Sequence, residues 1–259
     1  MDFIPIFREI SDKIGIIIRE TPSGIIGTNP KGDITRDFDL KAEDCCFSIL
    51  SKKLKGFELL GEEVGSRVKG KPEYFFVLDP CDGSHNRAHN IGVYTFSIAG
   101  LKYRENPNVQ DVQFGFVKNL VSGEEYWAEK GKGMKYCGKP AKTSQESDFK
   151  KSTISADISA GNAHKVGKLL EKARYIRCLG TAAYGSALVS SGQVEAHVDV
   201  RGRLSIENFA ATHLMVKEAG GIASDSDGKA LNTPLDLKAQ SEIVFSGNRK
   251  IHEQILELL

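Results

Sequence analysis

The chain lacks long apolar runs and any patterned set of cysteines. Its longest apolar clusters, Ile14–Ile18 and Val93–Leu101, are too short or too interrupted to cross a bilayer, so membrane insertion is not expected. The five cysteines are odd in number and have no Cys-x-x-Cys spacing, and no stretch before Pro22 resembles a signal peptide. A reducing, cytoplasmic setting is therefore expected.

An excess of charge of either sign is also absent. Lysine and arginine number 35 and aspartate and glutamate 34, which leaves a formal net charge of +1. No basic run with interleaved aromatics stands apart, so nucleic acid is not expected as a partner. With 259 residues, 40% hydrophobic and 27% charged, the chain has the balance of a globular protein with a sizeable core. One large domain or two closely packed halves would both fit.

The first 140 residues have the pattern of two helices followed by a sheet, an α+β half. Apolar residues recur at intervals of three and four residues from Phe3 to Arg19, which predicts a helix that ends at Pro22-Ser23-Gly24. A second helical pattern runs from about Leu40 to Leu54, capped near Asp37 or Asp39. Short apolar or alternating segments then predict the strands of a mostly antiparallel sheet: Glu58–Leu60, Tyr74–Leu78, Tyr94–Leu101, Val112–Val117 and Glu124–Ala128.

Beyond Pro140 strands and helices alternate, which predicts an α/β half over residues 141–259. Gly220-Gly221 is expected to stop the longest helix of this half. The predicted strands are Ser152–Ala156, Val194–Asp199 and Glu242–Phe245, and the predicted helices are Ala163–Ala173, Ala182–Ser190, Leu204–Ala219 and Ile251–Leu258.

The string Asp79-Pro80-Cys81-Asp82-Gly83-Ser84 carries the clearest chemical signal. A strand of buried character runs directly into two carboxylates separated by a proline, followed by a glycine and a hydroxyl. Carboxylates suit hard cations such as Mg²⁺, and Gly83 lets backbone amides approach a phosphate oxygen. Taken alone, the string also fits a polar turn after a core strand, because Asp-Gly-Ser is common in turns.

Together with its companion strings, the chain resembles the inositol monophosphatase family. The hallmarks of that family are Asp-Pro-hydrophobic-Asp-Gly-Thr, an upstream Gly-Glu-Glu, and a downstream Asp before a helix that ends in Glu-Ala-Gly-Gly. Here Gly61-Glu62-Glu63 precedes the Asp-Pro string, and Glu218-Ala219-Gly220-Gly221 closes the expected helix. Further similar strings are Lys130–Gly133 and Leu179–Ala183, with Thr35–Asp39 and Asp199–Arg203 pointing to the archaeal branch, which often acts on both fructose 1,6-bisphosphate and inositol phosphates.

The resemblance implies a layered αβαβα sandwich, the sugar phosphatase fold, and a phosphomonoesterase that uses two or three Mg²⁺ ions, with Mn²⁺ as an alternative. One metal would generate hydroxide from bound water, assisted by Glu62 and Thr35, while a second stabilises the departing alkoxide. The catalytic residues would be Thr35, Glu62, Asp79 and Asp82. The metal-binding residues would be Glu62, Asp79, Asp82, Asn208 and the carbonyl of Cys81, with Asp39 and Glu63 at an outer position.

The resemblance further implies that the partner is a small phosphorylated metabolite and that the protein is a homodimer. Thr28–Asp33 would be a mobile flap over the site. The phosphate would be bound by Gly83 and Ser84. The sugar side would be lined by Gly180, Thr181, Ala182, Asp199 and Arg201.

Asn208 is the most consequential departure from the family pattern. It stands where the family has a metal-binding Asp, and Glu207 precedes it. An amide oxygen can coordinate Mg²⁺ but brings no negative charge, so weaker binding of a second metal is expected. Glu207 could substitute only if the helix start shifts from its expected place.

Four side chains near these strings have open roles. The His85 to His89 spacing would suit a zinc pair on a helix, but the neighbouring glycine and asparagines favour a loop with two surface histidines. Arg201 and Arg203 fit either a clamp for a second substrate phosphate or solvated surface positions.

Three functions are compatible with these features. The first is a Mg²⁺-dependent phosphatase acting on inositol monophosphate, fructose 1,6-bisphosphate or both. The second is a nucleotidase for 3′-phosphoadenosine 5′-phosphate. The third is a degenerate member that binds a phosphorylated metabolite without catalysis, because Asn208 replaces a metal-binding Asp.

Overall fold

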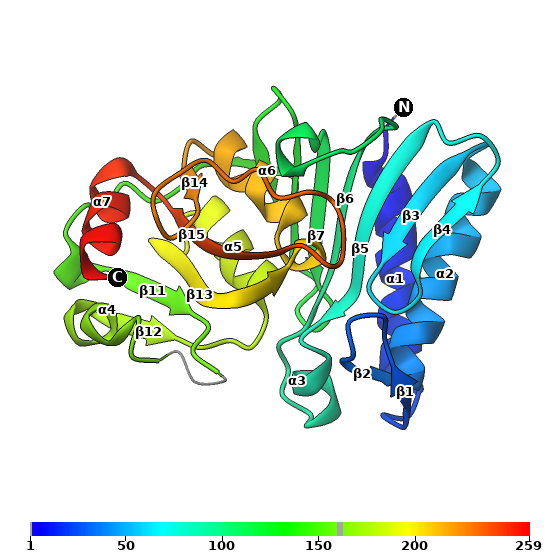
Figure 1. The fold of residues 1–259 in the computed structure, drawn as a ribbon, viewed down its shortest axis with the longest axis horizontal. Helices are drawn as coiled ribbons and strands as arrows, with labels where there is room; N and C mark the ends of the chain where they lie inside the picture. The colour runs from blue at the N-terminus through cyan, green and yellow to red at the C-terminus, as the bar shows by residue number, and fades with distance from the viewer. Residues whose placement is uncertain (1, 160–162) are drawn as a thin grey trace.

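Two β-sheets separated by a pair of helices define the architecture of this computed structural model, which describes residues 2–159 and 163–259 (Figure 1). The helices are α1 (Ile4–Glu20), α2 (Asp37–Lys53), α3 (Ser84–Ala88), α4 (Gly167–Lys172), α5 (Ala182–Ser190), α6 (Ala210–Glu218) and α7 (Arg249–Leu258). Short 3₁₀ turns, η1 (Val109–Asp111), η2 (Phe149–Lys151) and η3 (Ile206–Asn208), connect some of the elements.

The larger sheet has eight strands in the order β10-β9-β8-β7-β6-β5-β3-β4. Strands β3 and β5 pair in parallel and the other neighbours pair antiparallel, as expected for a mostly antiparallel sheet. Its strands are β3 (Phe57–Gly61), β4 (Gly65–Lys69), β5 (Tyr74–Asp82), β6 (Thr95–Lys102), β7 (Phe114–Asn119), β8 (Glu125–Glu129), β9 (Met134–Tyr136) and β10 (Lys139–Ala141).

The smaller sheet has five strands in the order β12-β11-β13-β15-β14, and a separate hairpin is formed by β1 and β2. Strand β11 pairs in parallel with both of its neighbours, while β15 pairs antiparallel with β13 and β14. The strands are β1 (Ile25–Thr28), β2 (Ile34–Arg36), β11 (Thr153–Ala156), β12 (Tyr175–Arg177), β13 (Ala196–Ser205), β14 (Ile222–Ser224) and β15 (Gln240–Ser246).

Successive residues of a strand point to opposite faces of its sheet, so each sheet packs against helices on both sides. Five layers result, the αβαβα sandwich expected from the sequence. On β5, Phe76 and Leu78 pack with α1 and α2, whereas Phe75 and Val77 pack in the core formed with α5 and α6. The same inner core contains Phe245 of the five-stranded sheet, and alternate residues of that sheet pack with α4 and α7 on its outer side. Helices α5 and α6 therefore share one core with both sheets.

Several element boundaries differ from the sequence expectation. The helix expected from Leu204 begins only at Ala210, because Leu204 and Ser205 still pair with β15 and η3 follows them. The helix expected over Ala163–Ala173 is limited to α4 in the described residues. The loop expected at His85 is wrong, since His85 lies in the short helix α3. Strands not predicted are β1, β2, β4, β9, β10, β12 and β14.

The structure distinguishes between Asp37 and Asp39, the two residues expected near the cap of α2. The backbone N–H of Arg36 donates to Asp39 Oδ2 at 3.3 Å, so Asp39 provides the capping contact at this helix start. The Asp37 carboxylate instead accepts from Lys41 Nζ at 2.6 Å, one turn along the helix. Within the described residues, no helix combines the length and apolarity that a membrane span requires.

Candidate active site

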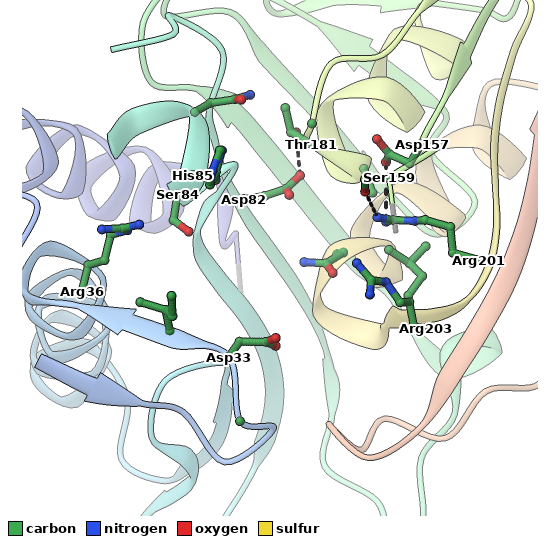
Figure 2. A pocket seen from close by; sticks show the side chains of 17 residues that line it. Asp33, Arg36, Asp82, Ser84, His85, Asp157, Ser159, Thr181, Arg201 and Arg203 are labelled. Carbon is green, nitrogen blue, oxygen red and sulfur yellow. Dashed lines mark hydrogen bonds and ion pairs between the residues drawn. The ribbon is translucent and has the colours of Figure 1, made fainter. Parts of the chain in front are cut away.

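A cavity of about 690 Å³ lies where the hairpin, the end of β5, the start of α5 and strand β13 meet. Figure 2 shows Asp82, Ser84 and His85 on one side of this cavity, with Asp157, Arg201 and Arg203 facing them across it. The predicted site residues that line it are Asp82, Ser84, Gly180, Thr181, Ala182, Arg201 and Asn208. Residues from both halves of the chain therefore build the site.

A β-bulge brings Asp79 and Asp82 to one face of the large sheet. Asp79 pairs with Ser97 and Asp82 with Thr95, so an advance of three residues along β5 lies opposite an advance of two residues along β6. In a regular strand, residues three apart point to opposite faces, and the extra residue cancels that alternation. The bulge includes Pro80, which cannot donate a hydrogen bond to a regular ladder. Both carboxylates consequently face the layer that holds α5, α6 and η3.

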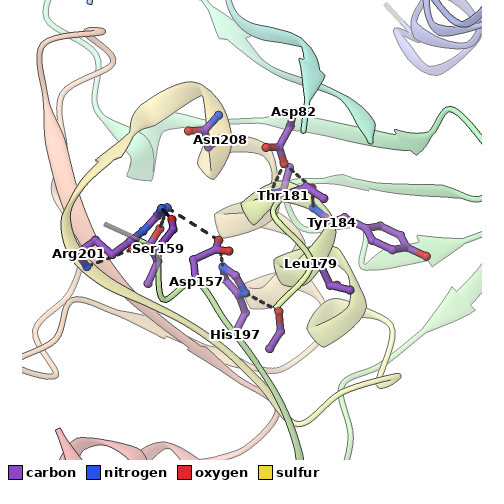
Figure 3. A network of polar contacts seen from close by, with 12 residues as sticks. Asp82, Asp157, Ser159, Leu179, Thr181, Tyr184, His197, Arg201 and Asn208 are labelled. Atoms are coloured by element: carbon purple, nitrogen blue, oxygen red, sulfur yellow. Dashed lines mark hydrogen bonds and ion pairs between the residues drawn. The ribbon is translucent and has the colours of Figure 1, made fainter. Parts of the chain in front are cut away.

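Asp82 is fixed by the start of α5 (Figure 3). Its Oδ2 accepts from the Thr181 hydroxyl at 2.6 Å and from the Ala183 N–H at 2.7 Å. Thr181 is also the N-cap residue, because its hydroxyl oxygen accepts from the Tyr184 N–H at 3.1 Å. A carboxylate at a helix N-terminus is favoured by the unsatisfied N–H groups and the helix dipole. The hydroxyl of Thr181 is thus used to position Asp82.

Asp79 is buried and has a partner on each oxygen. Its Oδ1 accepts from the Cys81 N–H at 2.9 Å, and its Oδ2 accepts from Asn208 Nδ2 at 2.8 Å. Burial raises the pKa of Asp79 well above its ordinary value, and the negative charges of Glu62, Asp82 and Glu207 raise it further. Asn208 therefore contacts the Asp79 carboxylate through its amide NH₂ group.

Lys31 joins two carboxylates beside this pair. Its ammonium group lies 2.9 Å from Glu62 Oε1 and forms an ion pair with Glu207 Oε1. Burial acts to lower the pKa of Lys31, but attraction to Glu62 and Glu207 outweighs burial and raises it. Glu207 is completely buried, and burial followed by repulsion from Glu62 raises its pKa. Because α6 starts later than expected, Glu207 lies in η3 and its side chain enters the cluster.

An outer group of carboxylates lies between α2 and the turn after β3. Thr35 donates its hydroxyl to Glu63 Oε2 at 2.6 Å. Burial and repulsion from Glu63 raise the pKa of Asp39 to about 8. Burial raises the pKa of Glu43 to about 7, although its carboxylate accepts from the Glu63 and Val64 N–H groups at 2.8 and 3.2 Å. Glu43 thus supports the turn that presents Glu62 and Glu63.

The donor set of the site fits a divalent cation. Several buried carboxylates of the site repel one another and thereby raise one another's pKa. A cation that binds oxygen ligands would relieve this repulsion. The carboxylates are not yet arranged around one point: among the described residues, no group of three or more His, Cys, Asp or Glu side chains has the geometry to hold a metal ion. Lys31 and Asn208 occupy positions between them instead.

Gly83 allows the chain to turn from β5 into α3. Its φ of 94° lies in the left-handed region, and a Cβ there would lie 3.0 Å from the Val93 carbonyl oxygen. The turn places Ser84 at the wall of the cavity, which Gly180, just before α5, also lines. Asn86 links the two segments, because its side-chain NH₂ donates to Leu179 O at 2.7 Å and to Val93 O at 2.8 Å.

Arg201 is held by acidic side chains. Its guanidinium donates to both oxygens of Asp199, at 2.9 and 2.6 Å, and lies 3.9 Å from Asp157 Oδ2. Asp199 is fully buried and acts on Arg201 from behind the cavity wall, while Asp157 itself lines the cavity. Arg203 lies exposed at the rim (Figure 2).

The two histidines of α3 are arranged as a stacked pair. The rings of His85 and His89 lie 4.1 Å apart with an interplanar angle of 28°, and His89 Nδ1 contacts the His85 carbonyl oxygen at 2.9 Å. His89 Nδ1 is thereby occupied, and the pair is not part of any metal-binding group in the described residues.

Three residues of the site were not identified from the sequence: Lys31, Glu43 and Asp157. Glu207 was considered only in case the helix start shifted, and α6 does start later than expected. Glu43 follows Asp39 by one helical turn, and this spacing could have indicated a shared face of α2. Asp157 directly follows the predicted strand Ser152–Ala156, at the sheet edge where polar residues gather. For Lys31, the sequence offers no signal beyond its place in the expected flap.

The chain is similar to known phosphatases over nearly its entire length. The sequence profile of the inositol monophosphatase family matches residues 6–259. A fructose-1,6-bisphosphatase/inositol-1-monophosphatase from Methanothermobacter thermautotrophicus is 31% identical over 258 residues, which cover 93% of this chain and 92% of that protein. A bifunctional NADP phosphatase/NAD kinase from Methanococcus maripaludis is 30% identical over 92% of this chain, which spans 44% of that longer protein.

Solved structures show the same fold. The structure of an inositol monophosphatase–fructose 1,6-bisphosphatase superimposes with a TM-score of 0.88 at 26% identity, and each chain is fully covered. An inositol monophosphatase from Thermotoga maritima, at 24% identity, superimposes with a TM-score of 0.83 over 100% of this chain and 96% of that one.

Proposed function

The chain belongs to the inositol monophosphatase family of phosphoric monoester hydrolases, and we propose that it releases phosphate from a small sugar or polyol phosphate with the help of Mg²⁺. The observation that carries this proposal is the placement of Asp79 and Asp82. A bulge brings them to one face of β5, and Asp82 lines a cavity large enough for a phosphorylated metabolite.

The residues that would hold the metal are Glu62, Asp79, Asp82, the carbonyl of Cys81 and the side chain of Asn208, with Asp39 and Glu63 at an outer position. A bound divalent cation supplies an activated water at neutral pH and offsets negative charge on the leaving oxygen. Mn²⁺ is the natural substitute to test, because it also accepts carboxylate and carbonyl ligands.

The chain's own groups orient the substrate and complete the catalytic set. Thr35, whose hydroxyl donates to Glu63, would help to remove a proton from the attacking water. Ser84 and the backbone after Gly83 would contact the phosphate, while Gly180, Ala182 and Arg201 would face the remainder of the substrate. The buried Asp199 would keep Arg201 in place.

Inositol monophosphate and fructose 1,6-bisphosphate are the first substrates to test, because the archaeal relatives carry both activities in their names. NADP is a second candidate. Two archaeal relatives are named bifunctional NADP phosphatase/NAD kinase, at 30% and 29% identity over 92% and 98% of this chain.

The test is phosphate release from these substrates and from 3′-phosphoadenosine 5′-phosphate, with Mg²⁺, with Mn²⁺ and with chelator. We expect metal-dependent release from at least one, and its loss in Asp82→Asn. The matched control is Asp227→Asn, whose carboxylate is exposed on a turn and pairs only with the neighbouring exposed Lys229 among the described residues. A folded protein that releases no phosphate from any substrate with either metal would overturn the proposal.

A further inference from the structure

The tip of the β1–β2 hairpin inserts a lysine into the carboxylate cluster. The Lys31 side chain is only 13% exposed and contacts Glu62 and Glu207, with Asp33 at 3.7 Å. The turn itself is shaped by Asn29, whose side-chain oxygen accepts from the N–H groups of Lys31 and Asp33, each at 3.0 Å. The turn therefore places the Lys31 ammonium group among carboxylates.

Apolar packing contributes little to the position of this hairpin. Ile25, Ile26 and Ile34 are 63%, 52% and 53% exposed, and every residue of β1 is exposed. The contacts that join the hairpin to the site are polar, namely the Lys31 ion pairs and the bond from Thr35 to Glu63. A hairpin held by charge responds to a change of charge in the site.

Glu207 indicates that the cluster has capacity for more positive charge than Lys31 supplies. Its side chain is completely buried, its Oε1 binds Lys31, and its Oε2 has no hydrogen-bond partner among the residues the structure describes. An unpartnered buried carboxylate oxygen is costly. Glu207 also adds a negative charge directly beside Asn208, the position that lacks one.

We propose that Lys31 is an internal cation of the metal-free site, and that a divalent cation must displace it from Glu62 and Glu207 in order to bind. The inference rests on the metal-dependent function proposed above and adds a residue that sets metal affinity. Ammonium and metal compete for the same carboxylate oxygens, so removing the ammonium favours the metal. Release of Lys31 also loosens the hairpin, because only the bond from Thr35 to Glu63 then remains of the polar contacts named above, and the exposed apolar residues do not anchor it.

The test measures Mn²⁺ binding to the purified protein by electron paramagnetic resonance of the free ion. In Lys31→Met the stem length is kept and the charge is lost, and we expect the dissociation constant for Mn²⁺ to fall about tenfold or more. Lys31→Arg keeps the charge and is expected to bind Mn²⁺ nearly as the unaltered protein does. Lys41→Met is the matched control, since Lys41 pairs with Asp37 on the surface of α2.

Hydrogen–deuterium exchange of the segment 24–36 gives an independent readout. Adding Mn²⁺ to the unaltered protein is expected to speed exchange in the hairpin, while in Lys31→Met exchange is already fast without metal. Equal or weaker Mn²⁺ binding in Lys31→Met, or hairpin exchange that Mn²⁺ leaves unchanged or slows, would overturn the role of Lys31 while metal-dependent activity stands. Absence of Mn²⁺ binding to both proteins would overturn this inference and the proposed function together.

Discussion

Replacing Asn208 by aspartate should separate the metal-free and metal-bound states of the site. In the structure Asn208 Nδ2 donates to Asp79 Oδ2 at 2.8 Å, and Asp79 is fully buried with a raised pKa. Asn208→Asp exchanges this donor for a second carboxylate oxygen. The hydrogen bond is lost, and two acidic groups face each other beside Glu62 and Glu207.

The size of the effect follows from these contacts. A hydrogen bond to a charged group contributes about 1.5–3 kcal/mol. Two carboxylates about 4 Å apart repel by about 4 kcal/mol at the effective dielectric constant of such sites, but proton uptake by Asp79 limits the cost. We therefore expect metal-free Asn208→Asp to lose about 2–4 kcal/mol of unfolding free energy. For a chain of this length, that corresponds to a fall in Tm of about 5–15 °C.

A divalent cation should reverse this loss, since it removes the repulsion that the substitution creates. The Mg²⁺ concentration for half-maximal phosphate release should then fall about tenfold to a hundredfold, because each tenfold change corresponds to about 1.4 kcal/mol of relieved repulsion. The assays are thermal unfolding with and without Mg²⁺, and a Mg²⁺ titration of phosphate release. Asn232→Asp, at an exposed position, serves as the control for added charge alone.

An unchanged or raised Mg²⁺ requirement in Asn208→Asp would refute the reasoning, as would a loss of stability that saturating Mg²⁺ fails to restore. Either result would mean that position 208 does not face a metal in the working enzyme.

Three further predictions concern the supports of the site. Gly61→Ala should cost about 1–3 kcal/mol in unfolding free energy, since the new Cβ would lie 2.3 Å from Glu43 Cδ; combined with Glu43→Ala it should cost less than the sum of the two single changes. Thr181→Val should cost about 1–3 kcal/mol and most of the activity, because Asp82 loses its 2.6 Å hydroxyl donor and Tyr184 its cap, whereas Thr181→Ser should stay near the unaltered protein. The metal-free protein should lose stability as pH rises from about 4.5 to about 7, because in this range burial keeps Glu43 protonated in the folded state but not in the unfolded state. Glu43→Gln should reduce the loss of unfolding free energy across this range by at most about 3 kcal/mol.

Each of these has a result that would contradict it. For Gly61→Ala it is additivity with Glu43→Ala in chemical denaturation. For Thr181 it is equal activity and Tm in the valine and serine variants. For Glu43 it is a pH–stability profile in the metal-free state that is the same with and without Glu43→Gln.

Much of the fold was predictable because it depends on local periodicity. The apolar spacing of Phe3–Arg19 gave α1 within a residue or two, and the apolar run Tyr74–Leu78 gave the start of β5. The short strands β4, β9 and β12 were missed, since they are three to five residues long and partly exposed, which leaves little periodic signal.

The chemistry of the site was predictable as a set of residue types, and its geometry was not. Asp79, Asp82 and Glu62 stand in strings that local composition makes visible. That Asp79 and Asp82 share a face required the bulge against β6, and the place of Asp82 required the start of α5, a hundred residues later. The apolar pattern predicts a helix from Leu204, but Leu204 pairs with β15, and α6 therefore starts later in the chain.

The sequence by itself determined the family, the layered α/β class and the acidic residues available for catalysis, because these depend on motifs and periodic patterns that survive within short stretches. Only the tertiary structure decided which charges meet. Lys31 contacts Glu62 and Glu207 across 31 and 176 positions of the chain. Electrostatic energy depends on distance and burial in space, and neither can be read from separation along the sequence.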